Sequence, residues 1–308
     1  MLYTYDLTLG LPHTNHRFFS EHLLMKYAGH FQWQSIAATA GLPLSVLRTI
    51  DGGEVYATFY YIEERIPDSS PLESFRLDDT VRFVIRLRSF KNVAVEGRLI
   101  FDRPERLTDA ARVERAVAPD HDEREFPFIR FANIFITPTK GNSRLRVAPP
   151  AQADFHELPP LPNEENPYQL TRAASESGLL GVLDDAWIEA GSYEHRYAID
   201  VDRDTNGAGL VYFANYIAFM DTAERLALDS LSLDEAQAAR MKQRSLRHRR
   251  VAYYGNADVA DTLAVRVTVL RHPAEPDRVG FRYSIERQED GQRICLSESV
   301  KALPEGGS

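Results

Sequence analysis

Residues 202–231 have the sequence DRDTNGAGLVYFANYIAFMDTAERLALDSL, and this stretch decides the fold that the sequence predicts. Its second part carries apolar residues three and four positions apart, the spacing that places them on one side of a helix. These residues are Tyr216, Ile217, Met220, Ala223 and Ala227. We therefore predict a turn over residues 202–209 and one helix over residues 210–231, with an apolar side that must be buried.

Strand patterns lie on both sides of this helix. Tyr193–Val201 alternates as a strand before the turn, and β-branched or aromatic residues alternate in four later segments. These later segments are Arg249–Tyr254, Thr262–Arg271, Arg278–Glu286 and Ile294–Ala302. One helix with several mostly antiparallel strands buries its apolar side if the sheet curves around it.

The first half of the chain repeats the same order of patterns. It predicts a strand over residues 2–9, a turn over residues 10–15, and a helix that begins near Ser20, whose hydroxyl suits an N-cap. Further strands are predicted over Val55–Glu63, Thr80–Ser89, Val93–Arg103 and Phe128–Thr137. The dipeptide at residues 79–80, Asp-Thr, recurs at residues 261–262, and each copy opens a long strand. This repetition indicates a duplicated module.

A proline-rich stretch separates the two halves. Residues 147–167 are VAPPAQADFHELPPLPNEENP, and proline lacks the N–H group that sheet pairing needs. We predict an α+β chain with a first module over residues 1–146, a linker over residues 147–184 and a second module over residues 185–308. Each module is expected to be a curved antiparallel sheet wrapped around one long helix, which is the hot-dog arrangement.

Composition excludes several classes of protein. The chain of 308 residues is 44% hydrophobic and 26% charged, as in soluble globular proteins. It contains no run of about 18 apolar residues and no signal-peptide pattern, so we expect a cytoplasmic protein that does not enter a membrane. A net charge of -9 argues against nucleic-acid binding. The single cysteine, Cys295, is interpreted as a small apolar residue on a strand.

Residues 204–216, DTNGAGLVYFANY, resemble the D-x-D-x-x-G-x-V-Y/W-x-x-N-Y signature of hot-dog acyl-thioester hydrolases. The resemblance implies that Asn206, Tyr212 and Asn215 lie at a substrate site. However, Asn206 replaces the acidic residue that serves those enzymes as base or nucleophile, and an amide can do neither at neutral pH. Further along the helix, Glu224 is either a buried carboxylate at this site or the partner of Arg225 or Arg250.

The first half resembles a second group. Residues 9–15 (LGLPHTN), 19–26 (FSEHLLMK) and 28–30 (AGH) are similar to the double hot-dog acyltransferase/decarboxylase family of polyketide biosynthesis, of the leinamycin-pathway type. This resemblance implies an acyl-CoA substrate such as methylmalonyl-CoA, loss of carbon dioxide, and delivery of a propionyl group to an acyl carrier protein. No cofactor is expected, because the coenzyme A thioester is itself the substrate.

The resemblance also implies a key tyrosine on the strand after the first helix, where Tyr60 and Tyr61 lie. Adjacent residues on a strand point to opposite faces, so only one of them is expected to face the site, and we favour Tyr60. It is a nucleophile, a hydrogen-bond donor or a purely structural tyrosine, and sequence does not separate these roles.

Polar residues gather before the first helix. Decarboxylation leaves an enolate oxygen, and the first turn of a helix offers free N–H groups to such a charge. His13 and Asn15 are therefore candidate catalytic residues, with Thr14 and Ser20 as candidate substrate contacts. Four histidines, His13, His16, His22 and His30, also invite a metal interpretation, but their spacing matches no metal motif, and none is expected.

Residues 244–250, RSLRHRR, are strongly basic. Arg247, Arg249 and Arg250 are candidates for binding cofactor phosphates or an acidic carrier protein, although a solvated strand face is the simpler explanation.

Two other activities remain open, a thioesterase and a hydratase, as does a non-catalytic protein that binds acyl carriers. Two modules in one chain form the dimer-like unit that single hot-dog chains build by association, and a homodimer of the whole chain is a further expectation.

Overall fold

The computed structural model describes residues 1–15, 19–118, 125–139, 141–207, 209–231, 241, 243–259 and 261–303. The chain divides into two compact units, residues 1–140 with 144–169 and residues 141–143 with 170–308. The division between residues 169 and 170 falls inside the predicted linker. Each unit is described by itself below.

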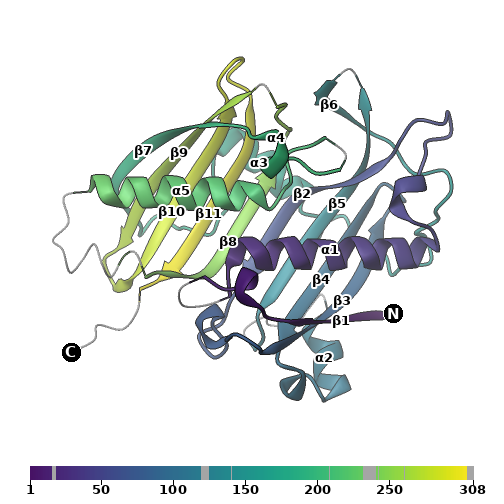
Figure 1. Cartoon of the computed structure of the whole chain (residues 1–308), viewed down its shortest axis with the longest axis horizontal. Coiled ribbons are helices and arrows are strands. Elements are labelled where there is room, and N and C mark those ends of the chain that lie inside the picture. Colours follow the sequence, from purple (N-terminus) through teal and green to yellow (C-terminus); the bar gives the residue numbers. More distant parts are fainter. Residues whose placement is uncertain are drawn as a thin grey trace. The chain divides into compact units, whose positions relative to one another are not determined.

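The first unit is built around helix α1 (Glu21–Ala40), which lies along one face of a sheet (Figure 1). Its strands are β1 (Leu2–Thr8), β2 (Tyr56–Arg65), β3 (Thr80–Phe90), β4 (Ala94–Asp102), β5 (Phe128–Thr139) and β6 (Gly141–Val147). They pair antiparallel in the order β1-β3-β4-β5-β2, and β6 pairs with β5 off this path. The short helix α2 (Ala110–Ala116) follows β4 in the chain.

Helix α1 begins where the sequence predicts. Ser20 holds the N-cap position, although its hydroxyl makes no capping hydrogen bond. Gly41 ends the helix with φ at 65°, a left-handed conformation that favours glycine. The buried side of the helix packs on rings of the sheet, where Phe31 stacks on Tyr5 with ring centroids 4.7 Å apart and lies 5.1 Å from Phe83.

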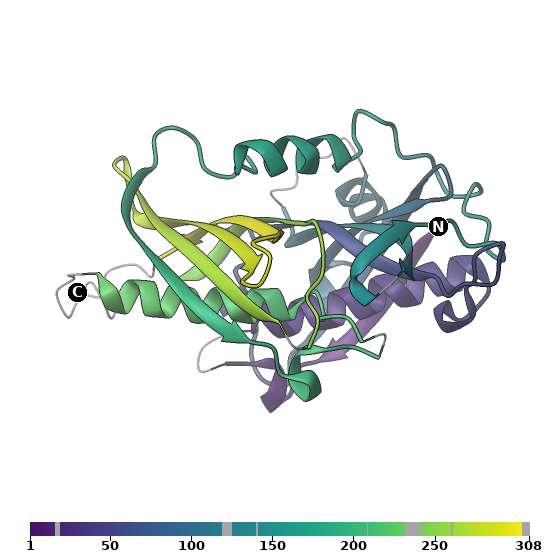
Figure 2. The same cartoon turned by 90° about the horizontal axis from the view of Figure 1, so that it is seen from above.

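The second unit repeats the plan around helix α5 (Asn215–Ser230). Its strands are β7 (Ile188–Ala198), β8 (Ser245–Tyr253), β9 (Thr262–His272), β10 (Glu275–Arg287) and β11 (Arg293–Ala302). They pair antiparallel in the order β7-β9-β10-β11-β8. Figure 2 shows α5 and this sheet from a second direction. Cys295 is buried on β11, and burial raises the pKa of its thiol.

The start of α5 differs from the prediction. The helix expected from Leu210 begins only at Asn215, because the residues before it close the turn. Thr205 forms a β-bridge with Val211, and the Tyr212 N–H donates to a carbonyl of the turn. The strand expected to reach residue 201 likewise ends at residue 198, and residues 201–204 form the short helix α4 (Val201–Asp204).

The two sheets match row by row, which confirms the predicted duplication. Thr80 opens β3 and Thr262 opens β9, and counting from these positions gives equivalent rows across four strands. The row in the first unit is Ser89, Val95, Asn133 and Phe59. The row in the second unit is Arg271, Val279, Lys301 and Leu246. Beside this row each sheet has an irregularity, which leaves Tyr60 out of the ladder in one and Arg247 in the other.

The proline-rich segment is packed against the sheets. In the first unit Phe155 is fully buried and stacks on Phe135 with ring centroids 5.1 Å apart. Leu161 donates its N–H to the Ser89 carbonyl at 2.7 Å, which ties the segment to the edge of β3. The residues that follow it in the predicted linker form helix α3 (Tyr168–Ser177), whose Ala174 packs with buried residues of β8 and β11. We call residues 159–166 the strap.

Candidate active site

The turn before α5 carries the signature asparagines. Asn215 is 3% exposed, and its Nδ2 donates to the carbonyls of Arg203 and Asp204, each at 3.1 Å. The Oδ1 atom of Asn206 accepts the N–H of Leu210 at 3.2 Å. Both amides therefore serve to hold the turn in shape.

The buried carboxylate of this turn is Asp204, which is 2% exposed. Its Oδ2 accepts from the Tyr197 hydroxyl and from the N–H of Asp200, both at 2.8 Å, and its Oδ1 accepts from Arg203 at 3.2 Å. Burial, and then the bond to Asp204, raise the pKa of Tyr197 to about 12. A carboxylate with this many donors would have to give up some of them before it acted as a base.

Tyr212 stands between the two asparagines in the sequence and is half-buried. Burial raises the pKa of its hydroxyl to about 12, so the hydroxyl is protonated at neutral pH and can donate a hydrogen bond. Its ring lies 4.8 Å from that of Phe213. The predicted residues Asn206, Tyr212 and Asn215 thus lie at one turn, beside the start of α5.

Glu224 is fully buried in the middle of α5, as the interpretation of a buried carboxylate required. The predicted partners, Arg225 and Arg250, are wrong. The observed partners are Arg244, at 2.6 Å from Nε to Oε2, Lys301, at 2.7 Å, and the Tyr283 hydroxyl. Burial disfavours the ionised carboxylate, but the charges of Arg244, Lys301 and Arg249 outweigh this and lower the pKa of Glu224. The group is a paired ion in the core.

The basic stretch of β8 does not form one surface patch. Arg249 is fully buried, with Nη1 3.4 Å from the Met220 sulfur. Arg250 is half-buried and donates to the Leu180 carbonyl at 2.9 Å, and Arg247 donates to the Leu246 carbonyl at 3.0 Å. Alternation along a strand explains the split, because Arg249 and Arg250 point to opposite faces of the sheet.

His13 is held by both ring nitrogens. Its Nδ1 accepts the N–H of Gly10 at 2.7 Å, and its Nε2 lies 2.8 Å from the Tyr27 hydroxyl. Because Nδ1 acts as an acceptor, the ring proton lies on Nε2 and is donated to Tyr27. His13 therefore orients Tyr27, a residue of α1 that the sequence analysis did not single out.

Backbone contacts bring two of the other candidates before α1 close to His13, since the Ser20 N–H donates to the His13 carbonyl at 3.0 Å. Thr14 forms a β-bridge with Phe19, which closes the loop before the helix. Asn15 is exposed, and Ser20 is half-buried at the N-cap position. His16, one of the four histidines considered for a metal, lies outside the described residues.

Tyr60 and Tyr61 do not point to opposite faces, so the strand alternation on which the choice between them was based is wrong here. Asn133 lies on the face that holds α1, because its Oδ1 accepts from Gln32 at 3.1 Å. Its neighbour Ala132 points to the other face, and Tyr61 pairs with Ala132. Tyr60 is the extra residue at the irregularity of β2, which breaks the alternation between the two tyrosines.

Both hydroxyls lie in one polar cluster. The Tyr60 hydroxyl donates to Asn166 Oδ1 at 2.8 Å, and that of Tyr61 donates to Glu63 at 3.0 Å. The charge of Arg130 acts on both tyrosines. Burial, and then the negative charge of Glu96, raise the pKa of Tyr60 well above its usual value, while Arg130 lowers it. Tyr60 is therefore a protonated donor at neutral pH.

Charged residues of β3, β4 and β5 and two residues of the strap complete this cluster. Glu96 is fully buried and is held by Arg88 at 2.6 Å and by Arg130. Arg88 also pairs with Glu165 of the strap at 2.7 Å. The strand predicted over Thr80–Ser89 includes Arg88, whereas Glu165 and Asn166 lie in a proline-rich stretch with no motif.

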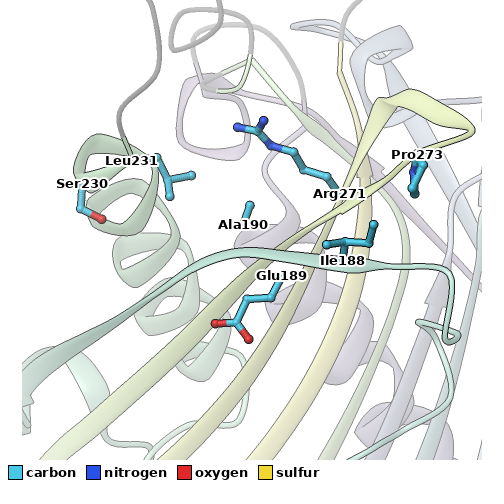
Figure 3. A pocket seen from close by; sticks show the side chains of 7 residues that line it. All are labelled: Ile188, Glu189, Ala190, Ser230, Leu231, Arg271 and Pro273. Carbon is cyan, nitrogen blue, oxygen red and sulfur yellow. The ribbon is translucent and has the colours of Figure 1, made fainter.

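A cavity of about 650 Å³ lies beside the end of α5 (Figure 3). Its described lining consists of Ile188, Glu189, Ala190, Ser230, Leu231, Arg271 and Pro273. No predicted site residue is among them. The cavity is thus separate from the turn at the start of α5.

The described ranges contain neither a candidate metal site nor a helix that could span a membrane. No group of three or more His, Cys, Asp or Glu side chains there could hold a metal ion. None of the helices described is long and apolar enough to cross a membrane.

Three solved thioesterases are similar in structure over nearly the whole chain. A protein described as an oleoyl thioesterase from Lactobacillus plantarum is 14% identical, with a TM-score of 0.63 and coverage of 99% of this chain and 96% of that chain. An acyl-ACP thioesterase from Bacteroides thetaiotaomicron is 10% identical, with a TM-score of 0.59 and coverage of 97% of both chains. A 12:0-ACP thioesterase from Umbellularia californica is 10% identical, with a TM-score of 0.62 and coverage of 98% and 94%.

These similarities show the fold, a double hot-dog, as predicted. At identities this low they do not carry over an activity. No protein-family model matches the sequence, and no curated protein matches it.

Proposed function

We propose that this chain acts on acyl thioesters, as an acyltransferase that decarboxylates a malonyl- or methylmalonyl-type coenzyme A thioester and passes the remaining acyl group to an acyl carrier protein. The observation that carries the choice is Asn206, which has an amide at the position where the signature of hot-dog acyl-thioester hydrolases has an acid. That amide is already bonded to Leu210, and the buried Asp204 beside it is occupied by three donors.

Decarboxylation requires hydrogen-bond donors for the developing enolate oxygen, in a site that excludes water. It needs no carboxylate base. The bond between the α-carbon and the departing carboxylate breaks, and its electron pair moves onto the thioester oxygen as an enolate while carbon dioxide leaves. The enolate is then protonated at the α-carbon, and the carrier thiol displaces coenzyme A. A protonated Tyr60 suits stabilisation of the enolate oxygen, which a donor performs best when it is fixed beforehand.

Incubation of the purified chain with methylmalonyl-CoA and a phosphopantetheine-bearing carrier protein tests the proposal. Intact-protein mass spectrometry should show a propionylated carrier. Free coenzyme A and carbon dioxide should be released at the same time. Propionyl-CoA serves as the matched control, because transfer without decarboxylation separates the two steps. Formation of methylmalonate and coenzyme A with an unmodified carrier would contradict the proposal.

A thioesterase is the second candidate, and the three similar structures favour it, since each is described as a thioesterase. The Asn206→Asp variant separates the candidates. If Asn206 is what prevents hydrolysis, this variant should gain thioester hydrolysis that the unchanged chain lacks. Hydrolysis by the unchanged chain itself would make the thioesterase the better description, and no turnover of any thioester would favour the non-catalytic carrier-binding protein.

A further inference from the structure

Asn166 makes two bonds through one oxygen. Its side chain is 6% exposed, and Oδ1 accepts the Tyr60 hydroxyl at 2.8 Å and the N–H of Tyr168 at 3.0 Å. The second bond settles the orientation of the amide, because only its oxygen can accept from a backbone N–H. The first bond therefore fixes the direction in which the Tyr60 hydroxyl points.

The strap that carries Asn166 is itself anchored. Glu165 pairs with Arg88 at 2.7 Å, and the Glu165 carbonyl accepts from Arg130. Both arginines also hold the buried Glu96. The position of Asn166 is thus set by charged side chains of β3 and β5, on the same face as the tyrosines.

Tyr60 needs such support because of where it stands. As the extra residue at the irregularity of β2, it has no partner position across the ladder. A buried phenol whose oxygen lacked a partner would lose the free energy of a hydrogen bond. Rotation of the Tyr60 hydroxyl about its C–O bond lets it donate the same proton to a substrate oxygen in place of Asn166, without movement of the ring.

We infer that Asn166 is a positioning residue, which holds the ring and oxygen of Tyr60 in place until the hydroxyl turns to donate to the substrate oxygen. This inference rests on the proposed function, and it adds that Glu165 and Asn166 of the strap belong to the same site. Asn166 acts through Tyr60 and needs no contact with the substrate.

The test is a double-mutant cycle. Asn166→Ser keeps an oxygen that can accept the Tyr168 N–H but is too short to reach Tyr60. We expect it to lower kcat roughly tenfold in the unchanged background, as misplacement of a reacting group does, and to have no further effect when Tyr60 is already Phe. Asn166→Asp restores an acceptor of the same length and should recover most of the loss. Asn163→Ser makes the same chemical change at an exposed position of the strap and is the matched control.

A second readout does not depend on turnover. With 3-fluorotyrosine at position 60, the ¹⁹F resonance should shift in Asn166→Ser and stay unchanged in Asn163→Ser. Additive losses in the cycle, or an unchanged resonance, would overturn the inference. If the unchanged chain turns over no thioester, both the proposed function and the positioning role are wrong. If the chain is active and Asn166→Ser does not change its kcat, only the inference about Asn166 is wrong.

Discussion

The protonation state of Tyr60 limits what this residue can do. Burial and the nearby Glu96 raise its pKa, so its hydroxyl remains protonated throughout the neutral and mildly alkaline range. A protonated phenol donates a hydrogen bond but is a poor nucleophile. Of the roles that sequence left open, the structure therefore favours the donor.

Tyr60→Phe should lower kcat/KM on the order of 100-fold, the loss seen when one donor to a developing oxyanion is removed. Tyr56→Phe removes a hydroxyl from the same strand, bonded to the exposed Glu54, and should leave kcat/KM unchanged. The rate should not rise between pH 7 and 9 through ionisation of Tyr60. A rise that the Tyr60→Phe variant lacks would identify a phenolate nucleophile instead.

Glu224 should make the free energy of unfolding depend on pH in the acidic range. Its pKa is lower in the folded chain than the value of about 4.3 expected for an unfolded chain, so the unfolded chain binds more protons between these values. The contribution of Glu224 is therefore complete above that unfolded value and is lost as pH falls towards the folded one. Urea unfolding at a series of pH values measures this loss.

Glu224→Gln should destabilise the chain at pH 7 by about 3–5 kcal/mol, because it leaves buried cations without their counter-charge. Asp221→Asn is the control, since Asp221 meets Lys301 from a partly exposed position and should cost below about 1 kcal/mol. Equal losses from the two changes would show that burial of Glu224 does not decide its contribution.

The partners of these residues could not be predicted. Arg244 and Lys301 lie 20 and 77 positions from Glu224, and Asn166 lies 106 positions from Tyr60. Helical spacing placed Glu224 on α5, but the ladder register and the path of the strap decide which side chains reach it. Neither is visible in local spacing.

At the scale of elements, strand positions were predictable and strand irregularities were not. Alternation located β3, β5 and β9 to β11 within a few residues. The same alternation failed at Tyr60, because one extra residue reverses the side on which every later side chain lies. The start of α5 was misplaced for a different reason. Residues 210–214 have helical spacing, but backbone hydrogen bonds across the preceding turn hold some of them outside the helix.

The proline-rich segment supplies core residues, and Phe155 tests this. Phe155→Ala should cost about 3–5 kcal/mol of unfolding free energy, as expected for a fully buried aromatic ring. His156→Ala changes an exposed neighbour and should stay within about 0.5 kcal/mol. Chemical denaturation of the whole chain measures both, and a mild Phe155→Ala variant would mean that the segment only rests on the sheet.

At the scale of the whole molecule, the duplication was the most secure prediction, because two copies of one pattern support each other. The structure adds that the copies differ in chemistry. At equivalent places, Gln32 and Asn133 form a neutral pair where Glu224 and Lys301 form a charged one. The irregularity carries Tyr60 in one sheet and Arg247 in the other.

We therefore expect one active site in each chain. Titration with a non-hydrolysable methylmalonyl-CoA analogue, followed by calorimetry, should give a stoichiometry of one. Changing His248, the counterpart of Tyr61 in the second sheet, to Ala should leave kcat unchanged, whereas Tyr60→Phe removes most turnover. A stoichiometry of two would mean that each of the two units binds the thioester.

The packing of the proline-rich segment also bears on how the two halves could be separated. A cut after residue 146, where composition changes, would strip Phe155 from Phe135 and leave Arg88 without Glu165. A fragment that ends at residue 169 keeps these contacts. The longer fragment should therefore express as a soluble protein, whereas the shorter one should aggregate.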